Sequence, residues 1–508
     1  MRPSDPEHSG RTIIFVAGKD GTIQEKHVSR REFLKIAGVA GATAGLGAGL
    51  GGLVAACGGE EASTTTAGPT TTGGVTTTAG PTTTGGVATT GGVATTVGAT
   101  TTVNAGPETG PEIKIGFVTP RTGAMAPFAS TDTYLLERFA EYVGDGQVLG
   151  DKKKHPIKVI VADSQSDPNR AGQVGGDLIA NSGVNLMIVA STPETVNPVA
   201  AQAEALTAPC FSTDTPYQAL LGAAPAGGFK WTWHCFFGVE DFAGNYTTVW
   251  NDIPTNKKIG VMWPNDADGN AFRSFMPPII EGAGLTIVDG GSWQPGSEDY
   301  TQQISVFKRE GCEIGTGVFV TPDFTNFWKQ CRQQGWVPKI YCVDKGLLYP
   351  QAIDAVGAPI GYNLVSTLFW GPTWPYKSYL YGDTNQQFAD EFTKRSGEQW
   401  SAALLHAIIF EMAMWVLQNA DDPTNKESIN AAAAKMKFDS TAGLIDFTAP
   451  LMAQPPAPGH VADHIYKTPT MAGQWVKGTQ GHPVDYVSIS HVAAPNIPVD
   501  AKLLPIVP

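Results

Sequence analysis

The sequence of 508 residues is poor in charge and lacks the sequence patterns on which many enzymes depend. Only 16% of its residues are charged, and the formal net charge is −13. Because nucleic-acid phosphates need a basic surface, this balance argues against nucleic acid as a partner. The chain has no G-x-S-x-G, H-E-x-x-H or Walker sequence. No nucleophile–base pair can be identified, so an enzyme is not expected.

Metal and disulfide signals are also scarce. None of the six cysteines forms a C-x-x-C pair or has zinc-ligand spacing. Cys57 stands alone near the N-terminus, and the other five are scattered through the body. The sequence allows one disulfide, between Cys210 and Cys235, with buried thiols as the alternative. His460 and His464 are four residues apart but lie in a Pro-rich region, so neither a metal site nor a cofactor is expected.

The first apolar segment is only weakly hydrophobic. Residues 36–56 are long enough to span a membrane but consist mostly of Ala and Gly. A weak segment behind a charged stretch favours an export signal. "SRREFLK", with Arg30, Arg31, Phe33 and Leu34, resembles the twin-arginine signal, whose route exports folded proteins. "VAAC" resembles the lipobox of bacterial lipoproteins, which implies lipidation of Cys57 after removal of residues 1–56.

Residues 57–111 have almost no large side chains. They are mainly Thr, Gly, Ala, Pro and Val, and "AGPTTTGGV" occurs twice. Such a composition cannot build a hydrophobic core, so the segment predicts a flexible tether. Its root-mean-square span is roughly 40 Å, which would hold a domain away from a membrane surface.

From Glu112 onward, strand-like and helix-like segments alternate. Strands are expected at 112–118, 157–163, 184–191 and 210–214; residues 192–198 read as a loop before a helix at 199–208. A second set of similar size runs from 257 to 344. This order predicts an α/β fold whose parallel sheets carry helices on both faces, with ligands at the carboxyl ends of strands. The third region, 370–508, contains a long helix at 399–420 and ends in Pro-rich chain.

The order of several motifs resembles a known family. They are "IKIGFVTPRTG", "DSQSDPNRA", "VNLMIVASTPETVNPVA", "IGVMWPNDADGNA", "EDYTQQISVFKREG" and "FWKQCRQQGW" with "YCVD". Residues 112 to about 450 resemble the type I periplasmic-type solute-binding proteins of branched-chain amino acid and amide ABC importers.

That resemblance implies two doubly wound parallel-sheet lobes joined by crossover strands, with a ligand cleft between them. Crossovers are expected near 237, 367 and 450. Lobe 1 would hold 112–237 and 368–450, and lobe 2 would hold 238–367 and 451–508, including a C-terminal extension.

The resemblance also places a ligand site. A ligand carboxylate needs hydroxyls and free backbone N–H groups at helix starts. Hydroxyls at two adjacent strand ends match the family's carboxylate-binding loops: Ser191, Thr192, Thr195, Thr213 and Thr215. Helix capping is the alternative role for these residues. Asp344 falls at the family's acidic partner for the ligand ammonium, and a turn or cap aspartate is the alternative.

Some positions depart from the family pattern. Phe128 matches an aromatic pocket wall, although a core residue would look the same. Asp268 stands where family members often have tyrosine, and Asp214 is a further acid. These carboxylates suit a ligand with more positive charge or more hydroxyls than leucine. Trp370, Trp374 and Tyr376 gather near a crossover, where they would stack on a ligand or pack the hinge.

The resemblance implies an extracytoplasmic, lipid-anchored protein that binds a small solute. The solute, an amino acid or amide, would be captured by cleft closure and passed to the membrane permease of an ABC importer. No cofactor is implied. A ligand-sensing receptor module of the same fold is the main alternative, and a permease gene beside this one would discriminate between them. An enzyme and a structural cell-wall protein are less favoured.

Overall fold

The computed structural model describes residues 11–17, 23–29, 106–452, 457–479, 481–490 and 492–507. Near the N-terminus, β1 (Arg11–Ala17) pairs antiparallel with β2 (Ile23–Ser29), within the predicted signal segment. The predicted lipidation site Cys57 lies outside the described residues, as do residues 30–56 and the predicted tether up to residue 105.

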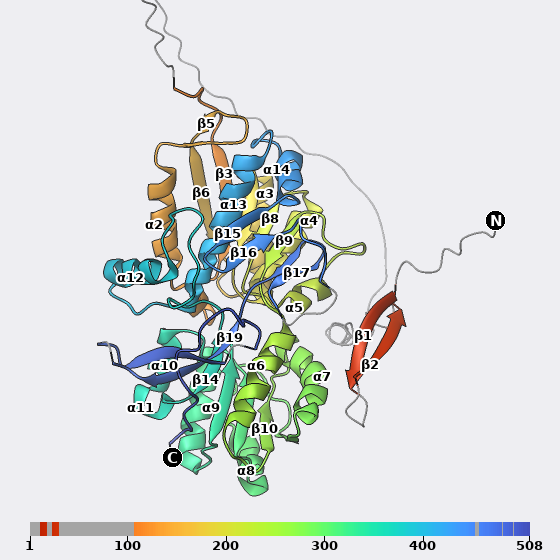
Figure 1. The fold of residues 1–508 in the computed structure, drawn as a ribbon, viewed down its shortest axis with the longest axis vertical. Coiled ribbons are helices and arrows are strands. Elements are labelled where there is room, and N and C mark those ends of the chain that lie inside the picture. Colours follow the sequence, from red (N-terminus) through yellow and green to blue (C-terminus); the bar gives the residue numbers. More distant parts are fainter. Residues whose placement is uncertain are drawn as a thin grey trace, which may run out of the picture. The chain divides into compact units, whose positions relative to one another are not determined.

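Lobe 1 is built on a seven-stranded sheet (Figure 1). All neighbouring strands pair in parallel except the edge strand β17, which is antiparallel to β18. In spatial order the strands are β17 (Gly459–Ala462), β18 (Ile465–Lys467), β9 (Thr232–Cys235), β8 (Cys210–Ser212), β7 (Leu186–Val189), β3 (Ile113–Thr119) and β6 (Ile157–Asp163).

Lobe 2 is built on a second seven-stranded sheet. Its first five strands are parallel, and β19 and β20 extend it as antiparallel strands. In spatial order they are β11 (Thr286–Asp289), β10 (Lys258–Met262), β12 (Ile314–Val318), β13 (Ile340–Asp344), β14 (Val365–Leu368), β19 (Met471–Lys477) and β20 (Val484–Ser490).

Helices cover both sheets, and Figure 1 shows them in two groups. The helices of lobe 1 are η1 (Ala126–Ala129), α2 (Asp132–Val143), α3 (Pro168–Ala180), α4 (Pro193–Ala205), α5 (Tyr217–Gly222), α12 (Asn385–Ser396), η2 (Ala402–His406), α13 (Ala407–Asn419) and α14 (Lys426–Ala433). Those of lobe 2 are α6 (Val239–Asp252), α7 (Ala267–Gly282), α8 (Thr301–Glu310), α9 (Thr321–Gln334), α10 (Pro350–Val356) and α11 (Ala358–Gly361). Two short hairpins, β4 (Gln147–Val148) with β5 (Lys154–His155) and β15 (Lys437–Ser440) with β16 (Gly443–Asp446), complete the body.

The residues of β3 show why the lobe 1 sheet has helices on both faces. Alternate side chains of a strand point to opposite faces. Ile115 and Phe117 belong to one buried cluster, in which the Phe117 ring lies 5.5 Å from that of Phe410 on α13. Val118 belongs to a second cluster together with Leu178 of α3 and residues of α4. Both faces of the strand are buried, as the predicted doubly wound α/β fold requires.

Three crossovers join the lobes. The first follows β9 near residue 237 and the second follows β14 near residue 368, both close to the predicted positions. The third crossover was predicted near 450, with 451–508 assigned to lobe 2, but the structure places it later. Strands β17 and β18 belong to the sheet of lobe 1, so the chain passes to lobe 2 only between Lys467 and Met471. The Pro-rich sequence here concealed two short strands.

Two helix starts also differ from the sequence predictions. Residues 192–198, expected as a loop, form the beginning of α4, with Pro193 in its first turn and Pro198 inside it. Proline suits a first turn, where backbone N–H groups have no partner within the helix. The long helix expected at 399–420 is divided: a 3₁₀ turn, η2, precedes α13. Ala402–Asn419 is apolar and long enough to span a membrane, but 83% of it is buried in the fold, as in a core helix.

Cys210, Cys235, His460 and His464 make structural contacts within the fold. Cys210 and Cys235 are buried, and each has a free thiol, so the disulfide that the sequence allowed is absent between them. Their strands pair with Cys210 opposite Thr232, which places the two cysteines out of register. His460 bonds to the Ala449 carbonyl, and His464 bonds to the Thr232 carbonyl and stacks on Trp233. Among the described residues no cluster could hold a metal ion.

Candidate ligand site

A cavity of about 50 Å³ lies between the two lobes. Its polar lining comes from the carboxyl ends of parallel strands, where α/β sheets bind ligands. Thr192 follows β7, Asp214 follows β8, Asp268 lies in the first turn of α7 after β10, Asp344 ends β13 with Lys345 directly after it, and Thr367 lies within β14. The volume is room for only about three to five water molecules, so the lobes are in close contact around it.

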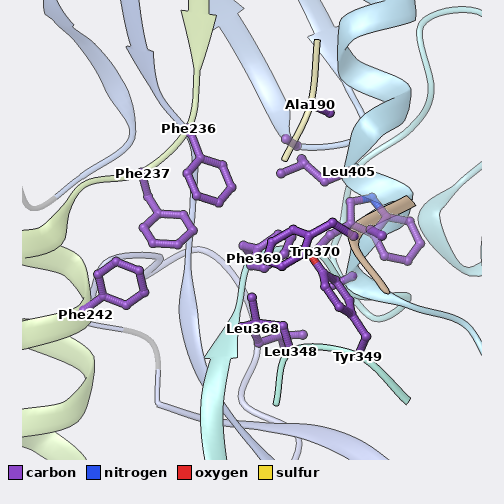
Figure 2. Packing of buried hydrophobic residues seen from close by; sticks show 14 of the residues in the cluster. Ala190, Phe236, Phe237, Phe242, Leu348, Tyr349, Leu368, Phe369, Trp370 and Leu405 are labelled. Atoms are coloured by element: carbon purple, nitrogen blue, oxygen red, sulfur yellow. The ribbon is translucent and has the colours of Figure 1, made fainter. Parts of the chain in front are cut away.

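The rest of the lining is largely aromatic. It includes Phe128, Phe236, Phe237, Phe242, Phe272 and Phe369. Figure 2 shows Phe236, Phe237 and Phe242 along one side and Phe369 beside them. The rings of Phe236 and Phe237 lie 4.1 Å apart, and the ring of Phe369 lies 5.4 Å from that of Phe236. Because these residues sit on the first two crossovers, the hinge of the molecule is also a wall of the cavity.

On the lobe 1 side, Asp214 ends a chain of buried polar groups. The two ring nitrogens of His406 donate to Asp132 Oδ1 (2.7 Å) and to Asp214 Oδ2 (2.5 Å). Thr119 donates to the other oxygen of Asp132 at 2.6 Å. A neutral imidazole has only one N–H, so two ionised carboxylates are both satisfied only by the imidazolium. Burial, opposed by His406, raises the pKa of Asp214. Although burial opposes it, Asp214 and Asp132 raise the pKa of His406 to about 10.

On the lobe 2 side, Asp344 forms no ion pair with any residue that the structure describes. Thr367 donates to Asp344 Oδ1 at 2.5 Å, and the Tyr246 hydroxyl lies 3.0 Å from the Thr367 hydroxyl. Burial raises the pKa of Asp344 to about 7, and the bond from Thr367 only partly offsets it. Asp344 is therefore close to half protonated at neutral pH.

Lys345 joins the two lobes at the edge of the cavity. Its ammonium lies 2.6 Å from Asp268 of lobe 2 and 3.2 Å from Glu194 of lobe 1. Burial would lower the pKa of Lys345, but the two carboxylates raise it. Burial, only partly offset by Lys345, raises the pKa of Asp268 to about 6. Burial would raise the pKa of Glu194, but Lys345 holds it below its ordinary value.

Three residues at these strand ends have left-handed backbone conformations that glycine normally adopts. The φ angles are 120° at Ser191, 66° at Asp214 and 63° at Lys345. Each such conformation costs on the order of 1–3 kcal/mol, and such strain clusters at functional sites. Two of the three residues also line the cavity, which identifies this edge of the sheets as the candidate site.

The structure brings most of the predicted site residues together. Phe128, Thr192, Asp214, Asp268 and Asp344 all line the cavity. Thr192 begins α4, but its hydroxyl makes no capping bond, and neither it nor the Ser191 hydroxyl has a hydrogen-bond partner among the described residues.

The other predicted hydroxyls do not line the cavity. Thr213 donates to the Cys235 carbonyl at 2.8 Å, and Thr215 donates to the Ser191 carbonyl at 3.0 Å. These bonds tie neighbouring strand ends together. Thr195 is buried in the first turn of α4. These threonines support the loops that carry the site.

The aromatic residues near the second crossover pack the hinge. Trp370 and Trp374 are buried and do not line the cavity, and Trp370 packs against Phe388 and Trp400. Phe369 lines the cavity instead. Sequence reasoning did not single out Phe369, Lys345 or His406. Lys345 directly follows the predicted Asp344 and was within reach, whereas His406 lies far along the chain inside an apolar segment and gave no signal.

Comparisons with known proteins identify the two parts of the chain. A family model described as periplasmic binding protein matches residues 112–463. A model of the twin-arginine translocation signal matches residues 27–47, which include Arg30 and Arg31. No sequence among the curated proteins matches the chain.

Solved structures with the same fold are distant in sequence. A leucine-binding protein of Thermotoga maritima has 16% identity and a TM-score of 0.60, covering 75% of this chain and 99% of its own. An isoleucine complex of a branched-chain amino acid transporter substrate-binding protein from Streptococcus pneumoniae has 15% identity and a TM-score of 0.57. The match covers 74% of this chain and 99% of that protein. A solute-binding protein of Rhodopseudomonas palustris in complex with 3,4-dihydroxybenzoic acid has 16% identity and a TM-score of 0.59. The match covers 75% of this chain and 96% of that protein. At these identities the likeness shows the type I fold and not a shared ligand.

Proposed function

Because the chain belongs to the periplasmic binding protein family, we propose that it captures an amino acid or a related small polar solute for an ABC importer. The members of this family bind solutes, so the chain is a binding protein and not an enzyme. The twin-arginine signal supports export from the cytoplasm. In our proposal, lipidation of Cys57 then anchors the protein at the outer face of the cell membrane, where it meets its permease.

The observation that carries the proposal is the composition of the cavity between the lobes. Carboxylates of both lobes, the Thr192 hydroxyl and a group of phenylalanine rings line the same cavity. A few polar groups that fix orientation within an apolar wall are typical of small-molecule sites. Asp344 is the proposed partner of the solute ammonium, and Phe128 is a proposed contact of its side chain.

Cleft closure is the proposed mechanism. The Lys345–Glu194 pair and the edge-to-face contact of Phe128 with Tyr349, at 5.0 Å, join opposite lobes. Both contacts are lost if the lobes separate about the crossovers. A solute that contacts both lobes binds the closed form more tightly and shifts the population toward it. The closed form is then what the permease recognises.

Asp344→Ala provides the direct test. Thermal unfolding of the purified protein is measured with amino acids, amides, amines and aromatic acids. A solute at about 100 times its dissociation constant stabilises the folded form by about 2.7 kcal/mol. We expect at least one such shift in the wild type, none in Asp344→Ala, and a wild-type shift in Asp252→Ala, which changes an exposed aspartate. Undiminished binding by Asp344→Ala would refute the site, and silence across the panel would refute small-solute capture.

A further inference from the structure

We propose that the cavity selects a small organic amine of net positive charge and rejects the zwitterionic α-amino acid of the same carbon skeleton. The inference rests on the proposed solute-binding function and defines its substrate class more narrowly. Its basis is which polar atoms of the cavity are already bonded and which remain available to a ligand.

The available polar atoms include two carboxylate oxygens, one from each lobe. Asp214 and Asp344 line the cavity with exposures of 4% and 3%. Asp214 Oδ1 and Asp344 Oδ2 have no hydrogen-bond partner among the described residues. A buried, unpartnered carboxylate oxygen is costly to leave without a donor. An ammonium group supplies up to three donors and a compensating charge, so both oxygens favour a cationic ligand.

The cations beside the cavity offer no donor to an anion. An ammonium has three donors, and the Lys345 ammonium already meets Asp268 Oδ2 and both oxygens of Glu194. His406 uses both ring nitrogens on Asp132 and Asp214. A ligand carboxylate would therefore compete with carboxylates of the protein for every cation present.

The start of α4 is also poorly suited to an anion. A helix N-terminus attracts anions through its free N–H groups. Here Pro193 has no N–H, and the N–H groups of Thr195 and Val196 bond to the Thr192 carbonyl. Glu194 places its own carboxylate in this first turn. The Thr192 hydroxyl lines the cavity without a hydrogen-bond partner among the described residues, and a hydroxyl accepts a bond from an amine as readily as it donates one.

The balance of charge around the cavity points the same way. Five carboxylates lie in or directly behind its lining, against the two cations Lys345 and His406; they are Asp132, Asp214, Asp268, Asp344 and Glu194. Even with Asp344 protonated, negative charge is in excess. The phenylalanine rings add an apolar wall, and aromatic faces attract cations. An amine with an apolar body satisfies both the charge and the wall.

His406 fixes the direction of the lobe 1 carboxylate. Its bond to Asp214 Oδ2 prevents the side chain from turning, so Oδ1 stays directed away from His406. In the closed form an amine bonded to both Asp214 and Asp344 would link the lobes. Without the amine, the two negatively charged carboxylates would repel each other across a shared low-dielectric space. Closure then depends on a positive ligand, which is a source of specificity independent of the shape of the cavity.

Two matched series of compounds test the proposal on the purified protein by isothermal titration calorimetry. One is 3-methylbutylamine, leucine and 4-methylpentanoate; the other is 2-phenylethylamine, phenylalanine and 3-phenylpropanoate. Each series keeps one skeleton while the charge passes from cation to zwitterion to anion. In at least one series, we expect the Kd of the amine to be lower than that of the amino acid by about tenfold or more.

The outcomes separate this inference from the function on which it rests. Tighter binding of an amino acid or an acid, or failure of both amines to bind, overturns amine selection. If those other solutes bind and raise the unfolding temperature, solute capture stands without amine selection. If no compound of these series or of the broader panel binds, both proposals fail.

Asp214→Asn removes the lobe 1 charge and keeps an oxygen that His406 can contact. We expect it to weaken amine binding by about tenfold to a hundredfold, in line with removal of a buried charged partner. The exposed Asp252→Asn is the control and should bind as the wild type does. Equal amine affinity in folded Asp214→Asn would contradict the role of Asp214.

Proton release gives a second readout, measured first on the wild type. The groups that act on Asp344 are the hydroxyls of Thr367 and Tyr246 and the carboxyl of Asp268; Lys345 follows it in sequence. Since the pKa of Asp344 is about 7, a cation bound there displaces its proton at neutral pH. The heat of amine binding should therefore differ between phosphate and Tris buffers, and Asp344→Asn should abolish that difference. Identical heats in the wild type would contradict an amine at Asp344.

Discussion

The two sides of the cavity carry similar carboxylates in different electrostatic settings. Asp214 of lobe 1 is bonded to His406, whose pKa of about 10 keeps it positively charged. Asp344 of lobe 2 is bonded only to a hydroxyl, and burial raises its pKa to about 7. Lobe 1 therefore supplies a carboxylate matched to a fixed positive charge. Lobe 2 supplies one whose charge depends on what enters the cavity.

This difference teaches that burial alone does not set the role of an acid. Asp214 and Asp344 are almost equally buried, with 4% and 3% exposure. The distinction comes from residues remote in sequence: His406 stands 192 positions after Asp214. Burial raises the pKa of both acids; His406 opposes that rise at Asp214, whereas hydroxyl groups oppose it at Asp344.

The largest expected effect comes from breaking the lobe 1 arrangement with His406→Leu. The substitution leaves Asp132 and Asp214 buried without their shared cation. Removing one partner of a buried ion pair costs about 3–5 kcal/mol. We expect a loss of this size in the free energy of unfolding, measured by urea denaturation at neutral pH. As a control, Arg395→Gln, which breaks surface pairs with Glu141 and Glu391, should cost less than about 1 kcal/mol. Equal losses in the two variants would contradict a charged His406.

A smaller effect is expected from Lys345→Met at the junction of the lobes. The Lys345 side chain is 10% exposed, and that of its partner Glu194 is 26% exposed, so water compensates part of the loss. A hydrogen bond to a charged group contributes about 1.5–3 kcal/mol, and we expect a loss in that range. Small-angle X-ray scattering of the ligand-free variant should also show a larger radius of gyration. An unchanged radius would mean that this pair does not hold the lobes together.

The change expected to be smallest per step of the measurement is a difference in pH dependence between the lobes. Asp344 keeps its proton in the folded state up to about pH 7, while the unfolded chain releases it near 3.8. Its stabilising contribution is therefore lost as pH rises from about 4 to 7. His406 keeps its proton up to about 10 against 6.5 when unfolded, so its contribution is lost between about 7 and 10. Each group changes the free energy of unfolding by at most about 1.4 kcal/mol per pH unit.

Urea denaturation across these two pH ranges separates the contributions. We expect Asp344→Asn to flatten the dependence in the lower range alone, and His406→Gln to flatten it in the upper range. Flattening of the same range by both variants would show that the two carboxylates share one electrostatic environment.

The sequence predicted the general arrangement of this site because strand ends are local features. The strand "IYCVD" ends at Asp344 and the strand "CFSTD" ends near Asp214, so each acid could be placed at a sheet edge from its neighbours alone. The alternating strands and helices predicted two α/β sets of similar size, and the family resemblance implied that they form two lobes. Their partners could not: His406 lies inside an apolar segment, and only tertiary packing brings it to Asp132 and Asp214.

The third crossover has a consequence for the synthesis of the protein. Strands β17 and β18 of lobe 1 and β19 and β20 of lobe 2 all come from residues 459–490. Domains generally begin to fold while the chain is still being made. Here neither sheet can be completed before the ribosome has translated residues 459–490. The two sheets thus depend on the same stretch of chain for their completion, which suits a twin-arginine route that accepts folded cargo.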